Sequence, residues 1–424
     1  MDISSLVRMI FDQDLLTYIK DSTRQHQTNV QLQVSGITPE AVNILFDALQ
    51  TNNTLTDLNH NRRIHDHGYG VLGYEYSTLG AEEAVALADA LNTKHTLTLE
   101  IKDIGADFID MIANVLTTNS TLKSLSLADN EIDDAGVKAL ATALQTNHTL
   151  TSLDLASNDI GASLDLTRAK IGAEGAKPLA TVLKSNSSLT HLNLRGNRIG
   201  VEGAEALATA LLINHTLTSL DLAYCGIRDQ GVQALADALQ TNNTLTTLEL
   251  MMNDIGGEGA KALATALRKN DSLTTLNLEQ NSICDKGAEA LGFALRTNHS
   301  LTSLNLEYIE MGVTGAEALG CALRTNHCLT SLNLTNNNTG VKGAEALAGA
   351  LQTNHYLTSL NLVKNKIGNE GAAYIIESLA RKERCHGWTR GEGKKAVMRW
   401  QWASGALWRR SCMAVIGVIS CGSI

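Results

Sequence analysis

The chain has 424 residues, more than one ordinary core uses, and carries a formal net charge of −10. Its 44% apolar residues, 4% aromatic residues and two prolines exclude a mostly disordered chain and predict a core built mainly from Leu and Ala. The charge is uneven, because residues 381–424 hold nine Lys/Arg against two Asp/Glu and the other 380 residues therefore carry −17. An acidic body disfavours nucleic acid and anionic membranes as partners and favours a basic protein.

The cysteines and the N-terminal sequence indicate the cellular compartment in which the protein is expected. The seven cysteines are odd in number and include no CxxC pair: Cys225, Cys284, Cys321, Cys328, Cys385, Cys412 and Cys421. This pattern is typical of reduced cytosolic thiols rather than of a disulfide framework. The start MDISSLVRMIFDQDLL has no basic segment followed by an apolar one, and no segment has the roughly 18 uninterrupted apolar residues of a membrane span. We therefore expect a cytoplasmic protein without a membrane span.

The predicted elements begin with residues 1–26, an N-terminal cap, followed by a repeat array over 27–380. Weak repeats begin near Val30, Leu55 and Leu97, and residues 59–80 interrupt them. The insertion contains the triplet HDH, but no third and fourth ligand with zinc spacing accompanies these two histidines. A polar surface loop is therefore favoured over a metal site, and contact with a partner is its functional alternative.

From residue 122 onward the pattern LxxLxLxxN recurs, with Cys225 and Ile309 in place of its asparagine in two copies. It begins at Leu122, Leu150, Leu189, Leu217, Leu245, Leu273, Leu301, Leu329 and Leu357. Seven of the eight steps are 28 residues, and the 39-residue step after Leu150 contains a repeated LDL, so we interpret residues 157–170 as a local duplication of a strand and loop. With the weak copies there are about twelve units, and three usually suffice for a stable stack.

Residues 245–272, LTTLELMMNDIGGEGAKALATALRKNDS, show how one unit is expected to fold. The leucines of LTTLEL point inward from a short strand, and Asn253 bonds backbone groups of the following turn, so that stacked repeats form an amide ladder. Gly256 and Gly259 allow a tight entry to the next segment. The apolar stripe of a helix follows at Ala260, Leu263, Ala264 and Leu267. Asn270 is expected just past that helix, in the left-handed conformation that Asn tolerates.

The unit LTSLNLxxNxIGxEGAEALATALxTNH resembles the repeats of ribonuclease inhibitor, of the NOD-like receptors, of Ran GTPase-activating protein and of many bacterial repeat proteins, over roughly residues 27–380. The resemblance implies an α/β leucine-rich-repeat solenoid: a right-handed horseshoe with parallel strands on the concave face and helices on the convex face. It also implies a non-enzymatic protein-interaction scaffold, effector-like or innate-sensor-like. The alternative is a GTPase-activating regulator resembling Ran GTPase-activating protein, although that family's functional residues cannot be placed on this sequence. The motif is specific for fold and poorly specific for function.

The sequence motifs predict no catalytic, cofactor-binding or metal-binding residue. No phosphate loop, HExxH, GxSxG or kinase motif is present, so no cofactor is expected and a small-molecule ligand is disfavoured. Six of the twelve histidines occupy one slot after the predicted helices: His95, His148, His215, His299, His327 and His355. Because each belongs to a different repeat, they line a ridge instead of converging, and we interpret them as turn residues.

The candidate partner-binding residues come from a comparison between repeats. The two positions before the Asn slot vary freely, nothing in the solenoid core dictates them, and they are predicted to leave the strands on the concave side. Tyr and Met are favoured at interface centres and charges at the rim. The predicted binding residues are Arg195, Tyr224, Met251, Met252, Glu279, Glu307 and Tyr308. A uniform polar stripe beside them predicts a structural or solvating role for Asn193, Asp221, Glu249, Asn277, Asn305, Asn333 and Asn361.

Residues 381–424 form a basic tail of different composition. All four tryptophans lie there, at Trp388, Trp400, Trp402 and Trp408, together with three of the seven cysteines. The tail has neither heptads nor a helical stripe, so we do not expect it to be part of the solenoid. A basic membrane- or nucleic-acid-binding segment and an aberrant chain end are the two open interpretations.

Overall fold

The computed structural model describes residues 29–34, 36–37, 57–60, 78–79, 96–101, 106–128, 130, 132–158 and 173–385. The chain divides into two compact units, residues 1–199 and 200–424, which are described one at a time. Unit 2, and unit 1 from residue 96 onward, consist of short parallel strands that alternate with helices, so the predicted α/β solenoid fold is confirmed.

Unit 1 contains eight described strands and three described helices. The strands are β1 (Asn29–Val34), β2 (Gly36–Ile37), β3 (Asp57–His60), β4 (Thr78–Leu79), β5 (Thr96–Ile101), β6 (Ser124–Ser126), β7 (Ser152–Asp154) and β8 (His191–Asn193), and the helices are α5 (Ala106–Thr118), α6 (Asp134–Leu144) and α7 (Ala173–Leu183). Six of these strands pair in the order β1-β5-β3-β6-β7-β8, while β2 pairs with β4. Because β5 lies between β1 and β3, strand order departs from chain order among the weak repeats.

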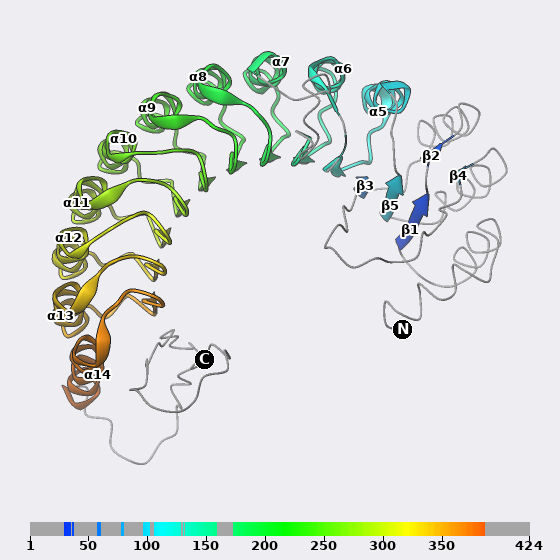
Figure 1. Cartoon of the computed structure of the whole chain (residues 1–424). Helices are drawn as coiled ribbons and strands as arrows, with labels where there is room; N and C mark the ends of the chain where they lie inside the picture. The colour runs from blue at the N-terminus through cyan, green and yellow to red at the C-terminus, as the bar shows by residue number, and fades with distance from the viewer. Residues whose placement is uncertain are drawn as a thin grey trace, which may run out of the picture. The chain divides into compact units, whose positions relative to one another are not determined.

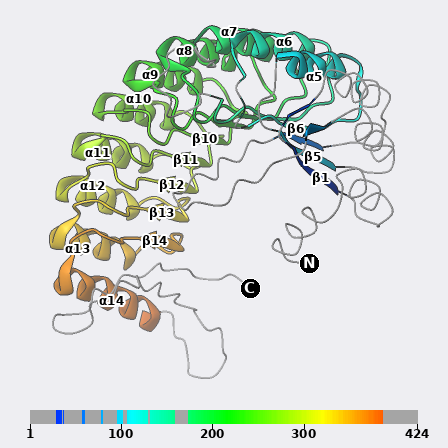
Figure 2. The same ribbon diagram turned by 45° about the vertical axis from the view of Figure 1, so that its right-hand side comes forward.

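Unit 2 is regular throughout its described residues. Its strands are β9 (Ser219–Asp221), β10 (Thr247–Glu249), β11 (Thr275–Asn277), β12 (Ser303–Asn305), β13 (Ser331–Asn333) and β14 (Ser359–Asn361), and its helices are α8 (Gly200–Leu211), α9 (Arg228–Leu239), α10 (Gly257–Leu267), α11 (Cys284–Leu295), α12 (Val313–Leu323), α13 (Gly340–Leu351) and α14 (Gly368–Cys385). Neighbouring strands pair in chain order with residues 28 apart as partners, such as Thr247 with Thr275. Figures 1 and 2 show these strands along the inner side of unit 2 and its helices along the outer side.

The core lies between the strands and the helices. Within the repeat at 245–272, the three leucines of LTTLEL and Ile255 are fully buried, and so are the four residues of the predicted helical stripe. Complete burial of each leucine is worth roughly 2 kcal/mol relative to exposure. The same slots recur every 28 residues, so each repeat covers the apolar surface of its neighbours.

The predicted asparagine ladder is present on the turns after strands β7, β8, β10, β11, β13 and β14, whereas Cys225 and Ile309 occupy the slot after β9 and β12. The Asn253 amide donates to the carbonyl of Leu222 in the preceding repeat at 2.7 Å, and its Oδ1 accepts from the N–H groups of Cys225 and Ile227 at 3.0 and 3.3 Å. Asn281 makes the same set of bonds to the repeat of Asn253. These side chains replace water as partners for buried backbone groups.

The expectation of a left-handed Asn270 is wrong, because Asn270 is not among the residues with positive φ. Instead its buried side chain belongs to a second amide ladder on the turn after each helix. Its Oδ1 accepts from Leu273 N–H at 2.8 Å, while its amide donates to the carbonyls of Leu239 and Asn242 at 2.8 and 2.9 Å. Satisfying three buried backbone groups at once outweighs the turn preference that the expectation rested on.

Helix α10 is capped from the repeat before it. Oδ1 of Asp229 accepts from the N–H groups of Gly256 and Gly259 at 2.7 and 3.0 Å. A Cβ at Gly259 would stand 2.5 Å from that same oxygen, so glycine is required there for space and not for an unusual backbone conformation. The tight entry predicted at these two glycines therefore serves an acidic cap that crosses from one repeat to the next.

Several predicted segments lie largely outside the described residues. Of the insertion at 59–80, only the strand residues 59–60 and 78–79 are described, and of the duplication at 157–170 only 157–158. Of the tail, residues 381–385 continue helix α14 and the remainder is not described. The predicted cap at 1–26 is likewise outside. Within the described part of the chain, no helix is long and apolar enough to cross a membrane.

Candidate interaction surface

In unit 2, the third residue after the end of each strand has the left-handed conformation. These residues are Tyr224, Met252, Gln280, Tyr308, Asn336 and Lys364, with φ between 50° and 58°. A non-glycine residue is uncommon there, and here neighbouring repeats enforce it. The N–H of Met252 donates to the carbonyl of Glu279 at 3.0 Å, and that of Gln280 to Glu307 at 2.9 Å. The turns are thereby fixed against one another before any partner arrives.

Large apolar side chains project from these fixed turns. Tyr224, Met252 and Tyr308 are 41%, 40% and 55% exposed, and Met251 is half-buried. We define the sheet-side patch as the side chains that follow strands β9 to β12 on this side of unit 2: Tyr224, Met251, Met252, Glu279, Gln280, Glu307 and Tyr308. Exposed aromatic and thioether side chains on a rigid backbone are the kind of anchor found at the centres of protein interfaces.

Two carboxylates are held in place within the patch. The amide of Asn305 donates to Oε2 of Glu279 at 2.9 Å, and the amide of Asn333 donates to Oε2 of Glu307 at 3.0 Å. Neither glutamate forms an ion pair with any residue that the structure describes. Each negative charge is therefore oriented by the next repeat but is not neutralised by it.

The polar stripe beside the patch has a structural role, as predicted. In the six stripe residues other than Glu249, the side chain closes a turn at the end of its strand. Oδ1 of Asn277 accepts from Glu279 N–H at 3.0 Å, and Oδ1 of Asn305 accepts from Glu307 N–H at 3.1 Å. Asp221 does the same for Ala223 at 2.8 Å. The stripe positions the backbone from which the candidate residues project.

Gln280 is a patch residue that the sequence comparison did not select. It occupies the left-handed position between Met252 and Tyr308, and its Oε1 is a buried acceptor without a hydrogen-bond partner. An unmet acceptor of this kind costs about 1–3 kcal/mol, and a rotation of the amide would present it to a donor on a partner. The sequence could have identified Gln280 as a candidate binding residue, because it directly follows Glu279 in the variable pair before the Asn position.

Arg195, the seventh predicted residue, belongs to unit 1. It is exposed, and its N–H donates to Oδ1 of Asn193 at 3.0 Å, which is the turn geometry seen in unit 2. The patch is defined within unit 2, so six of the seven predicted residues lie in it and Arg195 does not.

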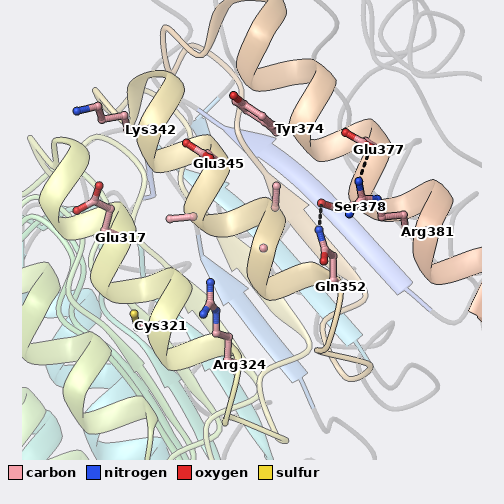
Figure 3. Close-up of a pocket in the computed structure, with 13 residues that line it drawn as sticks. Glu317, Cys321, Arg324, Lys342, Glu345, Gln352, Tyr374, Glu377, Ser378 and Arg381 are labelled. Atoms are coloured by element: carbon pink, nitrogen blue, oxygen red, sulfur yellow. Dashed lines mark hydrogen bonds and ion pairs between the residues drawn. The ribbon is translucent and has the colours of Figure 1, made fainter.

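A second concavity lies on the helical side of unit 2. It is an open groove of about 700 Å³ over helices α12 to α14. Figure 3 shows three acidic side chains (Glu317, Glu345 and Glu377) and three basic ones (Arg324, Lys342 and Arg381) around it. Arg381 pairs with Glu377 at 2.6 Å. With mixed charges and few apolar side chains, this groove offers less to a small molecule than a typical pocket does.

The described residues contain no group of three His, Cys, Asp or Glu side chains that could hold a metal ion. Cys284 is an exposed residue, but partial desolvation of its thiol raises the pKa, and the negative charge of the neighbouring Glu310 is the next largest cause. A raised pKa disfavours the nucleophilic thiolate. The described histidines of the recurring slot, such as His299, are exposed on separate turns, as the turn interpretation predicted.

Repeats of one strand and one helix, stacked through buried asparagine ladders, define a leucine-rich repeat protein of the ribonuclease-inhibitor type. The chain belongs to the leucine-rich repeat family, whose model matches ten segments that together make up more than half of it: 118–141, 146–163, 162–180, 185–208, 214–236, 241–264, 269–292, 297–320, 325–348 and 353–375. Such repeats form protein-interaction scaffolds, and this chain is one by class.

Two comparisons with solved structures accompany the family match. The chain is 26% identical to leiomodin-1 actin-binding site 2, with a TM-score of 0.28, over 32% of this chain and 75% of that one. It is 16% identical to the C-terminal domain of tropomodulin from Caenorhabditis elegans, with a TM-score of 0.32, over 38% of this chain and 92% of that one. Among curated proteins, none matches the sequence.

Proposed function

We propose that this protein is a non-enzymatic scaffold that binds a basic segment of another protein on the sheet-side patch of unit 2. The observation that carries the proposal is the pair of unneutralised carboxylates, Glu279 and Glu307, held by Asn305 and Asn333 beside the exposed ring of Tyr308. Lysine and arginine side chains combine a cation for the carboxylates with an apolar stem for the neighbouring ring and thioethers.

The charges around the patch support a basic partner. In strands β9 to β12 and the turns that follow them, no Lys or Arg occurs, and the acidic residues are Asp221, Glu249, Asp254, Glu279, Glu307 and Glu310. Within unit 2, the first basic residue at an equivalent position is Lys364, which follows β14. A surface of one sign accelerates encounter with a partner of the opposite sign and makes binding weaker as salt increases.

The first experiment is affinity capture from a cytosolic extract with the intact chain and with the triple variant Tyr224→Ala, Met251→Ala, Tyr308→Ala. A matched control truncates three exposed apolar side chains on turns that follow helices: Leu212→Ala, Ile213→Ala, Tyr356→Ala. We expect the patch variant to lose its partner and the control to retain it. Thermal unfolding of all three proteins shows whether they remain folded, because exposed substitutions usually change stability by less than about 0.5 kcal/mol.

A second variant tests the charge of the partner. Glu279→Gln, Glu307→Gln keeps side-chain size and an acceptor for each asparagine but removes two charges. We expect the captured protein to bind roughly tenfold more weakly to this variant at physiological salt, with a smaller salt dependence. Unchanged affinity, or a captured segment rich in Asp and Glu, would reject the basic partner while leaving the scaffold class intact.

The cytoplasmic location stays a prediction. The four cysteines whose side chains are described, Cys225, Cys284, Cys321 and Cys328, are free thiols, which is compatible with a reducing compartment. Fractionation of the source cells, with thiol labelling before lysis, would test it.

A further inference from the structure

A row of arginines crosses the helical side of unit 2. Arg268, Arg296 and Arg324 are the C-cap residues of helices α10, α11 and α12, and all three are exposed. Phe293 of α11 lies among them and is 53% exposed. We call these four side chains the arginine row. It contains none of the residues of the sheet-side patch, since it lies on the helices and the patch on the strand turns.

One aromatic ring holds two of the three cations. The guanidinium carbon of Arg268 lies 5.1 Å from the centroid of the Phe293 ring, and that of Arg296 lies 5.9 Å from the same centroid. Each contact between a guanidinium group and the ring is attractive, but together the two contacts keep two like charges close to each other. An anion bound beside the two guanidinium groups would relieve the repulsion between them. The contacts with the Phe293 ring also restrict the conformations of both arginine side chains before the anion binds.

These cations are not neutralised by the described part of the chain. Lys261 pairs with Glu258 and Arg381 with Glu377, whereas Arg268, Arg296 and Arg324 form no ion pair with any described residue. The negative end of a helix dipole amounts to about half a charge, so the cap position compensates each arginine only in part. In a chain of net charge −10, such a row stands out as a local positive surface.

The spacing of the row suits an extended polypeptide. Packed helices lie about 8–10 Å apart, so arginines at equivalent positions of α10, α11 and α12 are separated by about 10 Å per step. An extended chain covers that distance in about three residues. Acidic side chains two turns earlier on α11 and α12, Glu289 and Glu317, would repel a polyanion as broad as a nucleic acid but not a narrow strand of peptide. Figure 3 shows Glu317 and Arg324 on the same helix beside the groove.

We infer that the arginine row is a second interaction surface, which binds an extended acidic peptide segment with a carboxylate at every third residue and an apolar contact on Phe293. It is independent of the sheet-side patch and of opposite charge, so a protein of this kind would join a basic partner to an acidic one.

The test uses the full chain and a fluorescent peptide that repeats Glu-Ser-Ala, followed by anisotropy at low and physiological salt. We expect Arg268→Gln, Arg296→Gln, Arg324→Gln to weaken binding roughly tenfold. Phe293→Ala, which changes no charge, should weaken it a few-fold because the ring no longer positions two guanidinium groups. A peptide of the same composition with its glutamates contiguous should bind less tightly than the spaced one.

The matched control is Lys261→Gln, Lys286→Gln, Lys342→Gln, which removes three exposed charges from helices α10, α11 and α13. It should leave affinity for the spaced peptide within about twofold. Equal weakening by both triple variants, or no preference for the spaced peptide, would overturn the proposal in favour of general charge attraction. A labelled RNA that bound as tightly as the peptide, and was lost in the same arginine variant, would also overturn it.

Discussion

At the scale of single residues, asparagine acts as a buried connector in this protein. Asn253 and Asn270 stand in different turns of one repeat, yet each joins its own backbone to that of the preceding repeat through several hydrogen bonds. A buried amide is stabilising only while its donors and acceptors are all used. The contribution of an asparagine to stability therefore depends on its position in the repeat. Repeats with another residue at a ladder position can be used to test this.

Substitution in the ladder gives a matched set of stability predictions. Asn253→Ala leaves buried backbone groups without partners and should lower the free energy of unfolding by about 3 kcal/mol. Ile309 occupies the same slot two repeats later and is fully buried. Ile309→Asn should change stability by less than about 1 kcal/mol, because the offsets seen for Asn253 would place its amide at Leu278.

The control for this set is Ile255→Asn, where no ladder partners exist and a loss of about 3 kcal/mol or more is expected. Urea denaturation followed by circular dichroism measures all three variants. If Ile309→Asn lowered the free energy of unfolding as much as Ile255→Asn, the ladder position would not accommodate an asparagine better than another core position.

A second prediction at this scale separates stability from binding. Met252 has φ of 50°, a conformation that costs a non-glycine residue about 1–2 kcal/mol, whereas Met251 does not have positive φ. Met252→Gly should change the free energy of unfolding by less than about 1 kcal/mol, since relief of strain offsets the greater freedom of glycine in the unfolded chain. Met251→Gly lacks that relief and should be the more destabilising of the two. Both should weaken partner binding at the sheet-side patch.

At the scale of elements, helices of unit 2 are not capped independently. Asp229 lies in the first turn of α9 but caps α10, and Asp285 in α11 caps α12 with bonds of 2.8 Å to Gly312 and Gly315. Each such carboxylate joins two helices through bonds that a single repeat could not form. Neighbouring repeats thereby gain cooperativity beyond their apolar contact.

Removing one of these caps should therefore affect two repeats. Asp229→Ala should lower the free energy of unfolding by about 1–2 kcal/mol, the usual value of a charged cap with two hydrogen bonds. Asp271→Ala removes the same charge at an exposed position with no such bonds and should have an effect below about 0.5 kcal/mol. Hydrogen exchange gives the local readout: amides of α10 should lose protection in the first variant only. Equal protection in both variants would contradict a role of Asp229 in capping α10.

At the scale of the whole molecule, the surfaces of unit 2 differ in charge. The sheet-side patch presents oriented carboxylates with exposed Tyr and Met side chains, and the arginine row presents cations around Phe293. Both are built on regular elements, where the backbone is fixed by neighbouring repeats. A scaffold with two surfaces of opposite sign distinguishes between partners by charge as well as by shape.

The alternative of a GTPase-activating regulator makes a different prediction at this scale. The full chain, added in catalytic amounts to a panel of small GTPases loaded with GTP, should leave hydrolysis rates unchanged if the protein is a scaffold. An activator typically raises the rate by about 10³-fold or more, which phosphate release detects easily. Stimulation of any member that survives Arg195→Ala and the sheet-side triple variant would place the activity elsewhere on the chain.

The sequence by itself determined the repeat, the strand and helix of each regular unit, the core leucines and the variable positions at the strand ends. It did so because a 28-residue period with fixed apolar positions can bury those positions only by stacking one repeat on the next. Tertiary structure decided what depends on contacts between repeats: the left-handed turns, the bonds from Asn305 and Asn333 to the patch glutamates, the caps from Asp229 and Asp285, and the two arginines beside Phe293. Apart from Arg296 and Phe293, which are three residues apart at the end of α11, these contacts join residues about one repeat apart. A period read along the chain does not show which atoms of neighbouring repeats meet.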